Sequence, residues 1–237
     1  MQRVTLQPSY VLHGRSYRET SLLLEVFTRD HGRLGLVARG ARSARSSWKG
    51  LLQPFRPLLL SWNLRGELGT LTAVDQVAAP PPARGPALFC GLYVNELLIR
   101  GLHRSDVHPE LFESYRTLLT DLSSHPQPEP ILRMFEKQLL DVLGYGLQLE
   151  QECDTGAAVL PAAWYAWVPE RGMVRQEFQV ADSGEAPEAR LVSGAALLAL
   201  QSNRIEAAHM GELKQLMRRV LRHYLGGKPL VSQSLFQ

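Results

Sequence analysis

Cysteine is scarce in this sequence, and long apolar runs are missing. Only Cys90 and Cys153 occur among 237 residues, which fits a reducing compartment better than a disulfide-linked secreted protein. No apolar run approaches the ~18 residues that a membrane-spanning helix needs. The N-terminal stretch 1–12 lacks the apolar centre and cleavage site of a signal peptide. We therefore expect a cytoplasmic protein with no membrane partner.

Residue patterns of an active site or a metal site are missing as well. The segment 226–228 looks like the end of a phosphate-binding loop. However, Arg222 stands where the first glycine of such a loop belongs, and Pro229 replaces the required Ser or Thr. The seven histidines and two cysteines do not have the spacing of a zinc site, and no nucleophile motif is recognisable. The sequence predicts a protein that is not an enzyme and that carries no metal or other cofactor.

Acidic residues are few in the N-terminal third, which leaves it strongly basic. Residues 1–79 contain eleven Lys/Arg and five Asp/Glu, a net charge of +6. Residues 80–237 contain fifteen and eighteen, a net charge of −3, so the two parts sum to the +3 of the chain. Positive charge concentrated in one part of a chain indicates a polyanionic partner there.

The stretch 33–49 contains no Asp or Glu, and its basic residues recur every three to six positions beside Trp48. Cationic side chains at this spacing neutralise successive phosphates, and an aromatic ring offers a base a stacking surface. We predict a nucleic-acid-binding loop. A solvated basic loop is the alternative that the stretch alone leaves open. The predicted binding residues are Arg33, Arg39, Arg42, Arg45 and Lys49.

Residues 1–79 have the pattern of a small β-barrel. Short runs of strand-forming residues alternate with turns that contain glycine. Pro57 indicates a strand start or an edge position. Five short strands favour an oligonucleotide/oligosaccharide-binding (OB) fold, and an SH3-like barrel fits the strand count nearly as well. The expected strands are 10–13, 21–28, 33–39, 55–62 and 70–77, and the polar segment 15–20 is expected to break the chain between the first two.

A Pro-rich stretch at 79–86 is the expected domain boundary, because proline cannot occupy a helix interior. After it the apolar period changes from two residues to about 3.6, which predicts helices. The expected domains are an OB-fold domain at 1–79 and a helical domain at 80–237, with a less regular insertion around 148–190. The expected helices cover 88–102, 110–122, 131–143, 193–201 and 210–225, and a short hairpin is expected from 164–168 and 173–180.

Polar residues inside the apolar helices need a separate explanation. The 88–102 helix is apolar on nearly every face, so we expect it to be buried and its Asn95 and Glu96 to hydrogen-bond neighbouring elements. In the 131–143 helix, Arg133 lies beside Leu132 and Phe135. Its stem could lie along the bundle surface, or its charge could hold the acidic, apolar end of a partner peptide.

Six segments in order along the chain together resemble the bacterial RecO family of recombination mediators. They are YVLHGRSYRETSLLLEVFT (10–28), GRLGLVARGARS (32–43), KGLLQPFRPLLL (49–60), GLYVNELLIRGL (91–102), EPILRMFEKQLLDVLGYG (129–146) and YLGGKPLVSQSLF (224–236). They span nearly the whole chain, and the joint match is specific. The resemblance implies an α+β protein in which an N-terminal five-stranded OB-fold barrel is followed by an α-helical domain.

The resemblance also implies a function. Family members bind single- and double-stranded DNA, anneal complementary strands and, together with RecR, help RecA replace single-strand-binding protein (SSB) on DNA. A chain of this kind would be associated with the nucleoid. The basic residues of 33–49 then lie on the DNA surface. The family segment LRxFE matches 132–136, which makes Leu132, Arg133 and Phe135 the candidate site for the acidic tail of SSB.

One departure from the family and one alternative function follow. Many family members carry a four-cysteine zinc motif in the second domain. Here Cys153 stands roughly where the first cysteine would be and the other three are missing, so zinc is not expected and the role of Cys153 is left open.

An RNA-directed binding module is the alternative function, because OB folds and basic loops serve RNA equally well.

Overall fold

The computed structural model of the protein describes residues 2–78, 84–125, 127–176, 191–227, 230 and 232. The chain divides into two compact units: unit 1 comprises Met1–Pro126 with Leu230–Gln237, and unit 2 comprises Gln127–Pro229. Compactness therefore groups the first two helices with the barrel, whereas the expected boundary at 79/80 divides the chain by element type. Residues 79–83 of the Pro-rich stretch lie outside the described residues.

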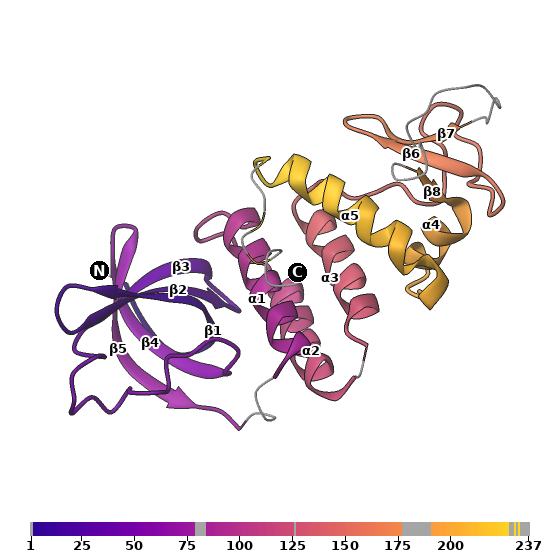
Figure 1. Cartoon of the computed structure of the whole chain (residues 1–237). Helices are drawn as coiled ribbons and strands as arrows, with labels where there is room; N and C mark the ends of the chain where they lie inside the picture. Colours follow the sequence, from indigo (N-terminus) through magenta and orange to yellow (C-terminus); the bar gives the residue numbers. More distant parts are fainter. Residues whose placement is uncertain are drawn as a thin grey trace. The chain divides into compact units, whose positions relative to one another are not determined.

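Five strands of unit 1 form a closed barrel in which β3 and β5 are parallel neighbours (Figure 1). The order around the barrel is β1-β2-β3-β5-β4, and β4 pairs antiparallel with β1 to close it. This is the strand order of the OB fold, so the predicted fold class is confirmed and the SH3-like alternative is excluded. The strands are β1 (Gln2–Tyr17), β2 (Ser21–Thr28), β3 (Gly32–Ala38), β4 (Leu58–Arg65) and β5 (Leu68–Gln76).

The first strand is much longer than the predicted segment 10–13, because it serves two neighbours in turn. Its first half pairs with β4 and its second half with β2. Register shifts between Val4 and Gln7, and between Val11 and His13, mark bulges that bend the strand around the barrel. The polar segment expected to break the strand is paired as far as Tyr17.

The parallel pairing of β3 with β5 depends on a glycine. Leu36 lies opposite Gly69, and a Cβ added at Gly69 would lie 2.6 Å from Leu36 Cδ2. A side chain at Gly69 would therefore require the fully buried Leu36 side chain to move. Behind this pairing the barrel interior is apolar and closed to water, since Leu36 and Leu60 are 0% exposed and Trp62 is 1% exposed.

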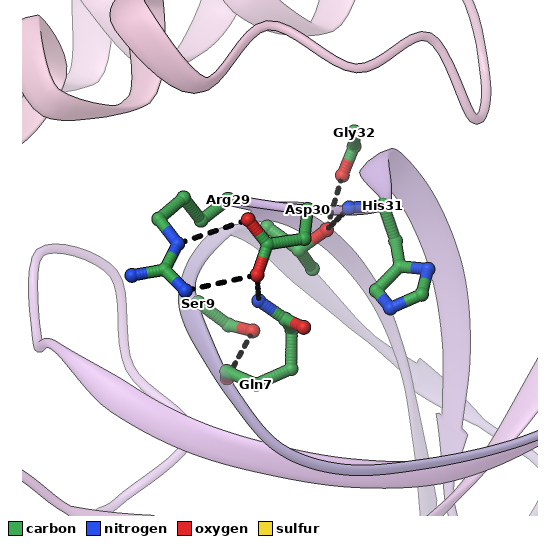
Figure 2. Close-up of polar contacts among 7 residues, drawn as sticks. Gln7, Ser9, Arg29, Asp30, His31 and Gly32 are labelled. Atoms are coloured by element: carbon green, nitrogen blue, oxygen red, sulfur yellow. Dashed lines mark hydrogen bonds and ion pairs between the residues drawn. The ribbon is translucent and has the colours of Figure 1, made fainter.

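Asp30 holds the turn between β2 and β3 to β1 (Figure 2). Its Oδ2 accepts a hydrogen bond from Gln7 Nε2 at 2.8 Å, and its Oδ1 accepts one from Arg29 Nε at 2.9 Å. The Arg29 guanidinium, followed by the Gln7 amide, holds the pKa of the Asp30 carboxyl below its ordinary value. This turn lies at the end of β2 and β3 away from the basic stretch after β3, so the charge of Arg29 is neutralised elsewhere on the barrel.

Two helices, α1 (Pro86–Gly101) and α2 (Pro109–Ser124), complete unit 1. Asn95 in α1 is 2% exposed. Its Nδ2 donates to the Leu12 carbonyl at 2.8 Å, and its Oδ1 accepts from the Tyr115 hydroxyl at 2.6 Å. One buried amide therefore joins β1, α1 and α2. The prediction that Asn95 bonds neighbouring elements is confirmed.

Aromatic rings surround this amide. Tyr10 and Phe27 of the barrel lie against Phe112 and Tyr115 of α2, with ring centroids 5.1 to 6.2 Å apart. Burial raises the pKa of Tyr115 well above its ordinary value and that of Tyr10 to about 12. The Tyr115 hydroxyl therefore stays protonated in the physiological range and remains a donor to Asn95.

Glu96, the other polar residue of α1, binds the C-terminal part of the chain. Its Oε2 accepts from the backbone N–H of Ser232 at 2.8 Å and from the Ser232 hydroxyl at 2.6 Å, while its Oε1 pairs with Arg100 at 2.6 Å. The prediction for Glu96 is thus also confirmed.

Unit 2 contains helices and one small antiparallel sheet of order β7-β6-β8 (Figure 1). The amphipathic helix α5 packs against α3 through its apolar face. The predicted hairpin is confirmed as far as Gln176, and residues 177–190 lie outside the described part. Among the described helices, none is long and apolar enough to cross a membrane. The elements are α3 (Glu129–Val142), β6 (Trp164–Val168), β7 (Gly172–Gln176), β8 (Leu191–Ser193), α4 (Gly194–Gln201), the 3₁₀ helix η2 (Ala207–His209) and α5 (Met210–Tyr224).

We predict that Tyr115→Phe destabilises the protein by about 1–2 kcal/mol at neutral pH, because Asn95 Oδ1 loses its buried donor while the ring remains. Urea unfolding measures the change. Tyr145→Phe is the matched control, since Tyr145 is 43% exposed and should change stability by no more than about 0.5 kcal/mol. Equal effects of the two substitutions would contradict a structural role for the Tyr115 hydroxyl.

Candidate nucleic-acid interface

The basic segment 39–57 between β3 and β4 begins as a chain of turns. The backbone N–H groups of residues 43, 46 and 49 each donate to the carbonyl three residues earlier. Successive arginines of the segment are also three residues apart, and each of them is exposed. They are Arg39, Arg42 and Arg45.

Apolar residues of the segment hold it against the barrel core. Ala41 and Leu52 are buried members of that core, and Trp48 is half-buried and packs against it. Since the Trp48 ring is partly covered, it holds the segment in place and offers less stacking surface than the sequence suggested. Four cations of the segment are exposed to solvent: Arg39, Arg42, Arg45 and Lys49. We call these four the cationic face.

Arg42 links the segment to the β1–β2 turn at residues 18–20. Its backbone N–H donates to the Thr20 carbonyl at 2.8 Å, and its Nη1 donates to the Glu19 carbonyl at 3.3 Å. These partners are carbonyl groups without a formal charge, so they do not compensate the positive charge of Arg42. Within the described residues, no carboxylate forms an ion pair with any member of the cationic face.

Arg33, the fifth predicted residue, is placed differently. It lies within β3, its side chain is 13% exposed, and its Nη1 lies 2.8 Å from Glu25 Oε2. Its Nε donates to the Leu102 carbonyl at 3.0 Å, and Glu25 also pairs with Arg104. The charge of Arg33 is therefore used to join β3 to the connection after α1. The sequence could not reveal this, because the contact with Glu25 depends on the register of β2 and β3, and Leu102 lies 69 residues away in the chain.

A pocket of about 510 Å³ opens at this end of the barrel. Its walls come from the β1–β2 turn, the end of β3 with Arg39, and the start of β5 with Leu68 and Gly69. OB folds bind oligonucleotides on the face of strands 2 and 3, between the loops that join strands 1–2 and 4–5. The pocket therefore lies where this fold places its ligand, next to the cationic face.

Sequence reasoning missed two residues of this pocket, Tyr17 and Arg18. Both fall in the segment interpreted as a polar break between strands. The guanidinium carbon of Arg18 lies 5.4 Å from the centroid of the Tyr17 ring, a cation–π contact. Arg18 also has a φ of 52°, a left-handed conformation that costs a non-glycine residue about 1–2 kcal/mol. An aromatic–arginine pair between two strand patterns is the signal that could have pointed to them.

The predicted peptide-binding residues lie on α3, and all three are buried. Leu132, Arg133 and Phe135 are 4%, 6% and 3% exposed. Arg133 Nη2 pairs with Glu136 Oε1 at 2.6 Å, while its Nε has no hydrogen-bond partner among the described residues. The interpretation that the Arg133 stem lies along the surface of the helical bundle is inconsistent with this burial, because the guanidinium itself is buried.

The described ranges contain no group of three or more His, Cys, Asp or Glu residues arranged to hold a metal ion. Neither Cys90, which is buried, nor Cys153, which is exposed, forms a disulfide.

Comparisons with known proteins cover nearly the whole chain. The family model described as Recombination protein O N terminal matches residues 1–80, and that described as Recombination protein O C terminal matches residues 83–234. Curated relatives carry the name DNA repair protein RecO. The protein of Nitrosococcus oceani is 45% identical over 236 residues, which cover 99% of this chain and 94% of that protein. The protein of Methylococcus capsulatus is 44% identical over 236 residues, with coverage of 99% and 94%. The protein of Coxiella burnetii is 43% identical over 235 residues, with coverage of 99% and 98%.

We predict that Arg33→Ala lowers the free energy of unfolding by about 1.5–3 kcal/mol, because it removes two hydrogen bonds from a charged, half-buried group. Arg45→Ala removes an exposed cation of the basic segment. Its free energy of unfolding should stay within about 0.5 kcal/mol of that of wild type. Denaturant unfolding of both variants makes the comparison. If Arg33→Ala were as stable as Arg45→Ala, Arg33 would be available for a ligand after all.

Proposed function

The chain belongs to the RecO family of recombination and DNA repair proteins, and we propose that it is a non-enzymatic DNA-binding mediator. In this role it anneals complementary single strands and, with RecR, helps load RecA onto DNA that SSB covers. The observation that carries the proposal is the cationic face beside the OB-fold pocket. Exposed Arg and Lys side chains without carboxylate partners supply affinity for phosphates regardless of sequence.

Charge neutralisation accounts for annealing in this proposal. Two single strands repel each other through their phosphates. Cations that contact both backbones release condensed counterions and lower that repulsion, so complementary bases meet more often. Pairing then releases free energy by itself, so the step requires no ATP. The sequence lacks a complete phosphate-binding loop, which fits such a mechanism.

Contact with SSB is the second part of the proposal. Leu132 and Phe135 are apolar and Arg133 is cationic, which are the residue types that match an acidic peptide ending in phenylalanine. All three are buried and Arg133 Nη2 is paired with Glu136, so the peptide carboxylate would bind Arg133 Nε, which has no hydrogen-bond partner among the described residues. Because the Arg133 guanidinium is buried, a carboxylate bound there would form a charge-assisted hydrogen bond shielded from water. Such a tether raises the local concentration of the protein on SSB-covered DNA without a tight DNA site.

An RNA-directed binding module remains the second candidate function, since the same OB pocket and cations suit single-stranded RNA. Competition between DNA and RNA strands of equal length and sequence discriminates between the two. A clear preference for RNA would favour the second candidate. A nuclease would reveal itself by metal-dependent loss of full-length strands in the same samples.

We predict that the triple variant Arg39→Ala, Arg42→Ala, Arg45→Ala flattens the salt dependence of single-stranded DNA binding. Each lost phosphate contact removes about 0.7 from the slope of log K against log salt, so the slope should fall by roughly 2. Fluorescence anisotropy of a labelled strand across a salt series measures it.

The matched control removes three exposed arginines outside the barrel: Arg116, Arg171 and Arg222. It lowers the net charge equally, and its salt slope should remain near that of wild type. If the loop variant keeps the wild-type slope, the cationic face does not bind DNA.

We predict that Arg133→Lys weakens binding of a peptide with an acidic, phenylalanine-ended tail by about tenfold, the equivalent of one charge-assisted hydrogen bond. Lysine keeps the charge but loses the planar fork. Anisotropy of the labelled peptide gives the affinity. Arg116→Lys is the control, because Arg116 pairs with Glu113 at the same i,i+3 spacing on an exposed surface. Wild-type affinity of the Arg133→Lys variant would exclude Arg133 as the carboxylate ligand.

A further inference from the structure

We propose that the pocket between the β1–β2 turn and the start of β5 binds one unstacked base of a single strand, with Tyr17 as the stacking residue. This inference rests on the proposed DNA-binding function and adds a subsite that distinguishes a single strand from a duplex. The cationic face alone would bind both forms through their phosphates.

The walls of the pocket combine apolar and polar groups, as the two faces and the edge of a base require. Leu68 is 41% exposed at the start of β5, and Val37 of β3, which also lines the pocket, is half-buried. Tyr17 lines the same space from the end of β1. A volume of about 510 Å³ has room for a base and its sugar.

Cationic side chains lie at the rim of the pocket, where the sugar-phosphate backbone of the bound single strand would continue. Arg18 and Arg39 are both exposed and both line the pocket. The guanidinium carbon of Arg18 lies 5.4 Å from the centroid of the Tyr17 ring, so a base that stacks on this ring takes the place of Arg18 or uses the opposite face of the ring. Stacking on an aromatic ring beside phosphate-binding cations is the general way proteins hold single strands without sequence preference.

The backbone around the pocket holds these groups in fixed places. Arg42 joins the basic segment 39–57 to the carbonyls of Glu19 and Thr20, which follow Arg18 in the β1–β2 turn. Tyr17 itself pairs with Ser21 across the hairpin. Tyr17 and the cationic face are therefore linked by hydrogen bonds. A nucleic-acid strand that runs along the cationic face would pass the pocket.

A duplex cannot use this subsite without breaking a base pair, because its bases are stacked and paired inside the helix. A single strand has no base pair to break. The subsite would therefore favour single strands and would hold a base turned away from its neighbours, which leaves adjacent bases open to a complementary strand.

Binding of single-stranded and duplex DNA of equal length to the full chain tests the proposal. We expect Tyr17→Ala to weaken single-strand binding about tenfold, a typical effect of removing one stacking ring, and to leave duplex binding unchanged. Tyr17→Phe, which keeps the ring, should bind like wild type. Unchanged duplex binding also shows that the variant is folded.

A second variant avoids any loss of stability. Arg18→Gly suits the left-handed turn at φ 52° and removes the guanidinium from the ring. It should weaken binding of single strands and of duplexes several-fold alike through the lost phosphate contact, while stacking on Tyr17 persists. A strand with 2-aminopurine in place of one adenine reports stacking on Tyr17 through a fluorescence change that Tyr17→Ala abolishes.

The proposal is overturned if Tyr17→Ala leaves single-strand affinity unchanged, or weakens single-strand and duplex binding equally. Failure of the proposed function has a different signature, which is an unchanged salt slope in the triple arginine variant. If Tyr17→Ala binds single strands like wild type but the triple arginine variant has a flatter salt dependence, the cationic face binds phosphates and the pocket binds no base.

Discussion

The parallel pairing between β3 and β5 is the contact on which the candidate site depends. Strands that follow one another in sequence can pair through tight turns, but this pair is separated by the basic segment and all of β4. Their meeting closes the barrel and brings the β1–β2 turn, the end of β3 and the start of β5 to one rim. Gly69 permits the close approach, because a Cβ there would collide with Leu36.

The same residue type has two different roles within a short stretch of chain. Arg33 is neutralised by Glu25 and is half-buried, whereas Arg39, Arg42 and Arg45 are exposed and have no carboxylate partner among the described residues. Position relative to the strand explains the difference. Arg33 lies inside β3, where a cross-strand neighbour supplies an acid. The other three follow the strand, on turns whose apolar side chains are anchored in the core.

A comparable division holds for polar residues inside the helices. Asn95 and Glu96 of α1 each form hydrogen bonds to other parts of unit 1, and neither lines the pocket. Arg133, by contrast, is buried with an unsatisfied Nε among the described residues. Its Nη2 is already paired with Glu136, so the ion pair belongs to the fold. Buried polar side chains thus mostly join parts of the fold, whereas the exposed arginines of the cationic face have no carboxylate partner among the described residues.

Periodicity, charge and turn chemistry were enough to identify the barrel, the main helices and the basic segment. These signals are local, because alternation, the 3.6-residue period and glycine or proline at bends all act within a few residues. The long, bent course of β1 and the three-residue strand β8 were not predictable in this way. A bulged strand loses its alternation, and three residues are too few to show any.

By itself the sequence determined the fold class, the cationic segment and the membership in a family that its segments resemble. Only the tertiary structure decided which cations are free. Ion pairs such as Arg33–Glu25 join residues from different strands, and contacts such as Arg33–Leu102 join residues that are far apart in the chain. The pocket and its Tyr17–Arg18 pair also required the folded barrel, because a cavity exists only where separate segments of the chain are held at fixed distances.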